Sequence, residues 1–287
     1  MDLSRREWIA GAGAGALRAA FGSAPGAAGA AEPPAATGRG LAITGLRITP
    51  VALPDPPILA ASGCHGPYFL RNVVEVETEA GITGIGETHG GERVAEALER
   101  SRPLVLGQSA FAYRKFAGEV AKLGAGAYAG IELACLDAAG RAAGRRLCEL
   151  LGGPVRDSVE FSAYLFFRYA ADHPRLLEDP RLVDGRGKGD RALDAWGEVR
   201  TPEAMAELAF KLHQRWGFRC QKLKAGVLPP EVELAALKAV SERFGGKHKL
   251  RIDPNGRWKV ETALRIGGGL KGLPLEYYED PVQGQEA

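Results

Sequence analysis

The chain has 287 residues, a net charge of +2 and 45% hydrophobic residues, enough to build one large or two medium globular domains. Basic and acidic residues are interspersed, so the sequence lacks the basic stripe typical of nucleic-acid binding, and we expect no nucleic-acid partner. The four cysteines lack the paired spacing of zinc sites and small disulfide scaffolds, so we expect them to pack as small hydrophobic side chains. They are Cys64, Cys135, Cys148 and Cys220.

The first 31 residues have the character of an export signal. Arg5 and Arg6 precede a weakly hydrophobic Ala/Gly run over residues 9–31, which resembles a twin-arginine signal, and Ala28-Gly-Ala30 offers a small-residue cleavage site. The run is too rich in glycine to predict a stable membrane span. We therefore expect residues 1–31 to direct export to the periplasm or beyond. If the run is instead a disordered tail or follows a mistaken start codon, the protein is cytoplasmic.

A linker and two strand-like segments follow. Residues 32–41 are rich in proline and glycine, as linkers are. Residues 43–53 and 73–88 alternate between apolar and polar side chains, and Gly81 marks a hairpin turn in the second segment. Residues 62–72 are too polar and glycine-rich for a core, so we expect a mobile loop there. These patterns predict a small antiparallel meander.

The clearest helix of the first half covers residues 128–144. Its small apolar residues recur with helical spacing, which favours close packing against another element. With the meander, it predicts a small α+β domain over residues 42–155. The small-residue stripe consists of Ile131, Ala134, Cys135, Ala138, Ala139 and Ala142.

From residue 156 onward, strand-like and helix-like segments alternate. Such alternation predicts βα repeats, and the active site of a (β/α) barrel lies at the carboxyl ends of its strands. The first run, residues 159–167, is almost continuously apolar, which suits a strand buried on both faces of a parallel sheet. A polar segment over residues 168–200 is expected to cover the site as a loop. Further strands are predicted over residues 218–223, 249–252 and 275–278, with helices over 202–216, 230–244 and 260–270.

Two lysines end one of these strands. Lys222 and Lys224 are two residues apart, so their side chains share one face of the strand and point into the same mouth. Neighbouring ammonium groups repel, which lowers the pKa of each and allows one to act as a general base. An isolated Lys-x-Lys sequence is also explained if one lysine faces solvent and the other caps the C-terminus of a helix.

Carboxylates end the next two strands. Asp253 and Glu279 would bring hard oxygen ligands to the same mouth, and such ligands suit Mg²⁺, which keeps positions open for water or substrate. Either residue alone, each beside a proline, could simply form a turn or a cap. Turns do not explain why lysine, aspartate and glutamate occupy successive strand ends, so the pattern predicts a magnesium site.

Five stretches together resemble the enolase superfamily, in particular its glucarate dehydratase group of acid-sugar dehydratases. The resemblance covers residues 43–281. It implies an α+β capping domain over residues 42–155, followed by a partial α/β (β/α) barrel of the enolase type over residues 156–287. The stretches are SGCHGPYFLRN at 62–72, YLFF at 164–167, KLKAGV at 222–227, DPNGRW at 253–258 and YEDP at 278–281.

The resemblance also implies roles for individual residues. Lys224 would be the catalytic base that removes the proton α to a carboxylate, and Lys222 would bind that carboxylate and tune Lys224. Asp253 and Glu279 would hold Mg²⁺. Loss of the β-hydroxyl would then give a 2-keto-3-deoxy acid, the reaction of a hydro-lyase acting on a small acid sugar. Further substrate contacts are implied for His65, Tyr164 and Asn255.

The family pattern continues beyond the last residue of this sequence. A third metal ligand and the acid/base residues of the opposite face have no counterparts before Ala287. We therefore expect a fragment or truncated chain with little or no activity. The missing barrel half could be supplied by another chain, and a homo-oligomer is also possible. Two alternatives stay open: a racemase or cycloisomerase of the same superfamily, and a degenerate exported acid-sugar-binding protein.

Overall fold

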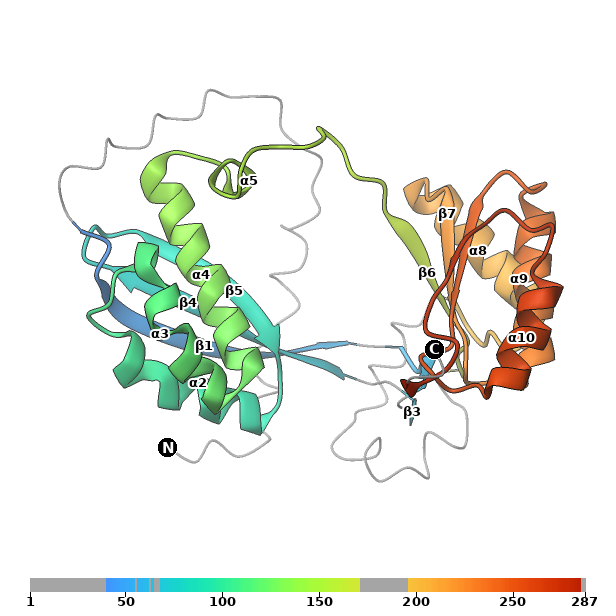
Figure 1. The fold of residues 1–287 in the computed structure, drawn as a ribbon, viewed down its shortest axis with the longest axis horizontal. Coiled ribbons are helices and arrows are strands. Elements are labelled where there is room, and N and C mark those ends of the chain that lie inside the picture. Colours follow the sequence, from blue (N-terminus) through green and yellow to red (C-terminus); the bar gives the residue numbers. More distant parts are fainter. Residues whose placement is uncertain (1–39, 55, 62, 65–67, 171–195, 285–287) are drawn as a thin grey trace. The chain divides into compact units, whose positions relative to one another are not determined.

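The computed structural model describes residues 40–54, 56–61, 63–64, 68–170 and 196–284. Contacts within the chain divide it into two units (Figure 1). The first contains the described residues up to 53 and from 69 to 157, and the second contains the described residues between 54 and 68 and from 158 onward.

Several predicted segments lie outside the described residues. The predicted export signal over residues 1–31 is one, and most of the predicted loop over 168–200 is another. Within the part of the chain that the structure does describe, none of the helices combines the length and apolar character that crossing a membrane requires.

The first unit packs helices on a three-stranded sheet with strand order β1-β4-β5, in which β4 and β5 are antiparallel. The predicted stripe of small residues lies on α4 and permits close packing: a Cβ atom at Gly84 of β5 would lie 2.0 Å from the carbonyl oxygen of Ala134. The strand β4 begins at Tyr68, inside the segment predicted as a loop. The elements are β1 (Ile43–Pro54), β4 (Tyr68–Thr78), β5 (Thr83–His89), α2 (Glu92–Val105), η1 (Ala110–Ala112), α3 (Arg114–Leu123), α4 (Ala125–Ala143) and α5 (Leu147–Leu150).

Residues 54–68 group with the second unit, whereas the sequence pattern assigned them to the capping domain. Their backbone bonds explain the difference. The N–H of Leu59 donates to the carbonyl of Phe167 at 2.7 Å, and the N–H of Tyr169 donates to the carbonyl of Pro57 at 3.1 Å. This segment also forms a two-stranded ribbon of β2 (Leu59–Ala60) and β3 (Gly63–Cys64).

The second unit is built on a four-stranded parallel sheet in the order β6-β7-β8-β9. Its helices cover one face, where buried side chains such as Leu223 and Ile252 meet Leu237. Helix α8 starts as predicted, since Thr201 Oγ1 accepts the N–H of Ala204 ahead of the first turn. An α+β unit followed by βα repeats confirms the predicted fold class. The elements are β6 (Ser162–Phe166), α8 (Pro202–Trp216), β7 (Cys220–Lys224), α9 (Pro230–Arg243), β8 (Lys249–Asp253), α10 (Val260–Gly269) and β9 (Leu275–Tyr278).

The prediction that β6 is buried on both faces is wrong for the described residues. Leu165 is fully buried, but Tyr164 beside it is 47% exposed. Helices cover only the face that carries Leu165, so the alternation along the strand leaves the other face accessible. The polar residues of the predicted site lie on that second face.

Candidate active site

Strand β7 presents both lysines on the face of the sheet that the helices leave uncovered. Leu223 between them is fully buried in the core, so Lys222 and Lys224 must point the opposite way. Both are nonetheless well enclosed, with side chains 10% and 12% exposed. Parallel register places Lys224 beside Asp253 and Lys222 beside Tyr164.

Asp253 is the polar centre of the site. Its side chain is 1% exposed at the end of β8. Oδ2 accepts hydrogen bonds or ion-pair contacts from Lys224 Nζ at 2.6 Å and Lys222 Nζ at 3.3 Å, while Oδ1 accepts the backbone N–H of Asn255 at 2.9 Å. Every oxygen of this buried carboxylate therefore has a donor, as a buried charge requires.

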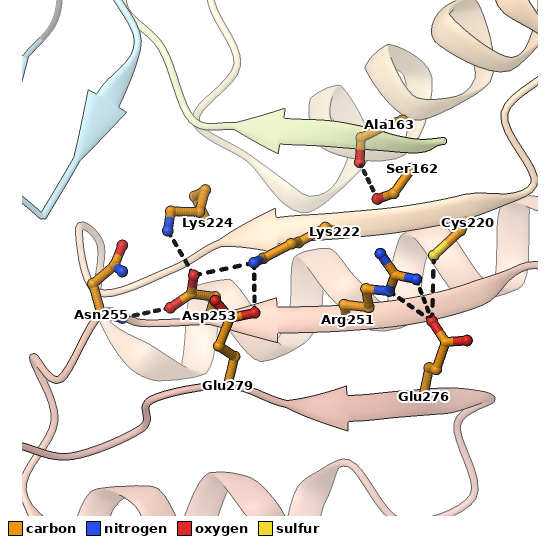
Figure 2. A network of polar contacts seen from close by, with 10 residues as sticks. All are labelled: Ser162, Ala163, Cys220, Lys222, Lys224, Arg251, Asp253, Asn255, Glu276 and Glu279. Atoms are coloured by element: carbon orange, nitrogen blue, oxygen red, sulfur yellow. Dashed lines mark hydrogen bonds and ion pairs between the residues drawn. The ribbon is translucent and has the colours of Figure 1, made fainter. Parts of the chain in front are cut away.

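Glu279 joins the same centre from the end of β9. Its backbone N–H donates to the carbonyl of Ile252 at 3.0 Å, which continues the pairing of β8 with β9. Its Oε2 accepts a hydrogen bond from Lys222 Nζ at 2.5 Å. Figure 2 shows the amine of Lys222 between the carboxylates of Asp253 and Glu279, with Lys224 on the other side of Asp253. Three neighbouring strands thus bring two cations and two carboxylates together.

The electrostatics differ from the sequence prediction. Burial, the largest influence on Lys222, lowers its pKa, but the hydrogen bond to Glu279 and the nearby Tyr164 and Asp253 together raise that pKa to about 12. The predicted lowering of the Lys222 pKa by lysine repulsion is therefore wrong for this arrangement. Two carboxylates, those of Asp253 and Glu279, contact its ammonium group, and their negative charge stabilises the protonated amine.

The pKa of Asp253 moves the other way. Burial alone would raise it, but hydrogen bonds from Lys224 and the Asn255 N–H, with the charges of both lysines, hold it below its usual value. Asp253 is therefore ionised and able to act as an anionic ligand at neutral pH.

The donor set fits a magnesium ion with two carboxylate ligands. Because one ammonium group contacts both Asp253 and Glu279, their carboxylates already face a common cationic centre. Mg²⁺ is commonly held by one or two carboxylates and completes its shell with water and substrate oxygens. Among the described residues, no group of three or more His, Cys, Asp or Glu side chains gathers as a metal site. Asp253 and Glu279 are thus the ligands that this part of the chain offers.

The remaining predicted contacts surround this centre unevenly. The Tyr164 ring centroid lies 5.4 Å from Lys222 Nζ and 5.7 Å from Lys224 Nζ, a cation–π arrangement with both amines. Asn255 adopts a left-handed backbone conformation, with φ of 50°, directly after β8. His65 lies outside the described residues.

Sequence reasoning missed two neighbours of the site. The ring of Tyr277 lies 5.8 Å from Lys222 Nζ, and its place two residues before Glu279 on a strand was an available signal. At the opposite end of the same face, Glu276 pairs with Arg251 and Lys249. No sequence signal places Glu276 there, because an irregularity between β8 and β9 shifts the register at Leu250 and Arg251.

Comparisons with known proteins identify the family to which the chain belongs. Residues 43–152 match the model of the mandelate racemase / muconate lactonizing enzyme N-terminal domain, and residues 204–287 match the enolase C-terminal domain-like model. The chain is 40% identical over 277 residues to a "Probable glucarate dehydratase" of Streptomyces coelicolor, covering 87% of this chain and 60% of that protein. It is 29% identical over 226 residues to a chloromuconate cycloisomerase of Cupriavidus pinatubonensis, covering 73% of this chain and 52% of that protein.

Solved structures give the same result. An enolase from Pseudomonas fluorescens with bound magnesium, potassium and tartrate superposes with a TM-score of 0.75 at 36% identity, over 86% of this chain and 59% of that one. An enolase from Thermobispora bispora with magnesium and formate gives 0.74 at 39% identity, over 85% and 59%. The chain thus spans between about half and three fifths of the length of these relatives. Matched at both of the family's domains, the chain belongs to the enolase superfamily.

Proposed function

We propose that this chain carries the magnesium-binding and base side of an acid-sugar dehydratase of the glucarate dehydratase type. One observation carries the proposal: Lys224 Nζ lies 2.6 Å from the Asp253 carboxylate, and the amine of Lys222 contacts both that carboxylate and the carboxylate of Glu279. An amine beside a two-carboxylate cation site suits removal of a proton α to a carboxylate. The similarity to a probable glucarate dehydratase supports the choice of substrate class.

The proposed roles follow from charge and position. Asp253 and Glu279 would hold Mg²⁺, an ion that is bound in the structures of two similar enolases. When bound, Mg²⁺ would stabilise the negative charge that develops on the substrate carboxylate as the α-proton leaves. Lys222, which is cationic at neutral pH, would bind that carboxylate and share this task. Tyr164, Asn255 and His65 would contact the rest of the sugar acid.

Lys224 would carry out the proton transfer. After its ammonium group has lost a proton to solvent, the neutral amine would accept the α-proton, and the electron pair of the broken C–H bond would form the new carbon–carbon double bond. The β-hydroxyl would take up a proton from solvent and depart as water. The resulting enol would rearrange to the 2-keto-3-deoxy acid, so the overall change is loss of one water molecule.

A product assay distinguishes this reaction from the alternatives. The chain is incubated with Mg²⁺ and a panel of acid sugars, and NMR follows each sugar acid. A dehydratase yields a 2-keto-3-deoxy acid, whereas a racemase or epimerase changes the configuration at the α-carbon and yields no keto group. Saturable binding with neither product nor deuterium exchange at the α-carbon in D₂O would instead support an acid-sugar-binding protein. Cycloisomerases and a dipeptide epimerase among the relatives make the second outcome the main competitor.

We also propose that the protein is exported. The twin-arginine-like pattern over residues 1–31 supports this, and those residues lie outside the described structure. Fusing residues 1–45 to a reporter that is active only after export would test it. Replacing Arg5 and Arg6 by lysine should leave the reporter in the cytoplasm, and unchanged export of that variant would contradict the proposal.

A further inference from the structure

Glu233 is a fully buried carboxylate that serves the loop following Lys224. It lies in the first turn of α9 and is 0% exposed. The backbone N–H of Gly226 donates to its Oε2 at 2.9 Å, and those of Val227 and Leu228 donate to its Oε1 at 2.8 and 2.9 Å. Within the described parts of the chain, no basic side chain forms an ion pair with Glu233. The carboxylate therefore serves as the hydrogen-bond acceptor for the backbone N–H groups of residues 226–228.

The energetics argue that Glu233 is not a packing residue. Burying a carboxylate is costly unless hydrogen bonds compensate, and an apolar side chain would fill the same space without that cost. Burial raises the pKa of Glu233, while the three N–H donors from the loop oppose that rise. The stabilising role left for a carboxylate here is to fix residues 226–228.

The same loop is also fixed from its other side. The N–H of Ala225 donates to the carbonyl of Asp253 at 2.9 Å. Gly226 has a φ of +78°, and a Cβ atom there would lie 2.4 Å from the carbonyl oxygen of Pro254. The loop is thus held between Glu233 and the segment that begins at Asp253. Lys224, the last residue of β7, directly precedes this anchored loop, and its amine lies 2.6 Å from Asp253 Oδ2.

We propose that Glu233 is a positioning residue that holds Lys224 against Asp253 by anchoring the loop over residues 226–228. The inference rests on the proposed function in one respect, the assignment of Lys224 as the base. Glu233 acts through the loop, since the hydrogen bonds of its carboxylate go to backbone N–H groups. Its sequence position gives no warning of this role, because an acidic residue in the first turn of a helix is ordinarily explained by the helix dipole.

The test compares Glu233→Gln with Glu231→Gln in the full chain. Glutamine keeps the size of Glu233, and its oxygen still accepts from Val227 and Leu228, but its NH₂ group would meet the Gly226 N–H as donor against donor. Glu231 lies in the same helical turn with its side chain 60% exposed and paired with Arg265, so it is a matched surface control.

Two readouts that need no turnover are measured. Amide hydrogen exchange reports the loop, and acetylation of each lysine, followed by mass spectrometry, reports access to the amines. For Glu233→Gln we expect amides 226–228 to exchange roughly tenfold faster and Lys224 to be acetylated at least about threefold faster relative to Lys222, because a buried donor has lost its partner. Glu231→Gln should match the wild type in both.

A positioning role predicts changes confined to amides 226–228 and the amine of Lys224, whereas general destabilisation predicts changes throughout the chain. Equal values in both variants would overturn the proposal, as would a uniform rise over all lysines. If circular dichroism shows that Glu233→Gln does not fold, the wild-type amides decide: slow exchange at 226–228 supports the anchor, and exchange as fast as in exposed loops refutes it. If the wild type turns over substrate, Glu233→Gln should lower kcat with little change in KM. A wild type that leaves the substrate α-proton untouched would refute the proposed function but not this inference.

Discussion

Lys222 and Glu279 meet at 2.5 Å between Nζ and Oε2, although 57 residues separate them in the sequence. The contact depends on the strand order, because β7 and β9 are the two neighbours of β8. Asp253 at the end of β8 lies within reach of the same amine, at 3.3 Å. Backbone pairing therefore brings the two carboxylates to one amine, which is the preorganisation that a cation site needs.

Removal of one carboxylate should weaken magnesium binding. Asp253→Asn keeps the shape of the side chain but removes its charge, so we expect the Kd for Mg²⁺, measured by titration calorimetry, to rise about tenfold or more. Glu276→Gln is the matched control. Glu276 lies on the same face, but it pairs with Arg251 and Lys249 at the other end of the strands. Equal affinities in the two variants would place the ion elsewhere.

Gly226 should tolerate no side chain. Its φ of +78° and the 2.4 Å approach of a Cβ to the Pro254 carbonyl predict both backbone strain and a clash. We expect Gly226→Ala to lower the free energy of unfolding by about 1–3 kcal/mol, measured by urea denaturation. Gly217→Ala supplies the comparison, because Gly217 has a φ of +75° but open space around it. Because of the clash, Gly226→Ala should lose more unfolding free energy than Gly217→Ala, and the reverse order would contradict the prediction.

The site could be predicted largely because strand ends follow from local patterns. Lys224, Asp253 and Glu279 each close or directly follow an apolar run, and parallel pairing brings such ends to one edge. The pKa of Lys222 could not be predicted in the same way. It depends on how close the carboxylates of Glu279 and Asp253 lie to the amine, and sequence spacing does not give distances of a few ångströms.

Other features could not be predicted because they depend on contacts between segments that lie apart in the sequence. Glu233 acts on N–H groups that precede it in the chain, and nothing in a helical pattern marks an inward-pointing first-turn carboxylate. The exposed face of β6 was missed because an apolar run does not reveal which face is covered, and Tyr164 proved accessible. Residues 54–68 were assigned by continuity along the chain, while their backbone bonds go to residues 167 and 169.

Stability should fall in mildly acidic solution because of His248. Its ring stacks on Phe244 with centroids 3.8 Å apart, and burial, followed by the charges of His213 and Arg219, lowers its pKa below the usual 6.5. The unfolded chain then binds the proton more readily than the folded one. The stability gained from the neutral ring is complete above about pH 6.5 and is lost as the pH falls from there through the folded-state pKa.

Urea denaturation at about pH 7.5 and about pH 5.5 checks this prediction. His248→Phe keeps an aromatic ring on Phe244 and removes the titrating group, so its unfolding free energy should fall less between the two pH values than that of the wild type. The same fall in both proteins would assign the pH dependence to other groups.

Cys135 should resist alkylation in the folded protein. It is fully buried in α4, and burial together with the charge of Glu132 raises the pKa of its thiol to about 12. Because the thiolate is the reactive form, we expect iodoacetamide to modify Cys135 only after unfolding, whereas the partly exposed Cys148 reacts in the native state. Peptide mass spectrometry distinguishes the two sites. Native Cys135 reacting as fast as Cys148 would show that this part of the core opens readily.

The most direct test of the proposed function is whether Lys224 removes a carbon-bound proton. The chain is placed with Mg²⁺ and D-glucarate in D₂O, and NMR follows deuterium at the carbons next to the carboxylates. We expect slow exchange with the wild type and with Lys211→Met, which alters a lysine on α8 whose side chain is 47% exposed. Lys224→Met should reduce the exchange about 100-fold or more. No exchange with the wild type, or equal exchange with Lys224→Met, would contradict the account.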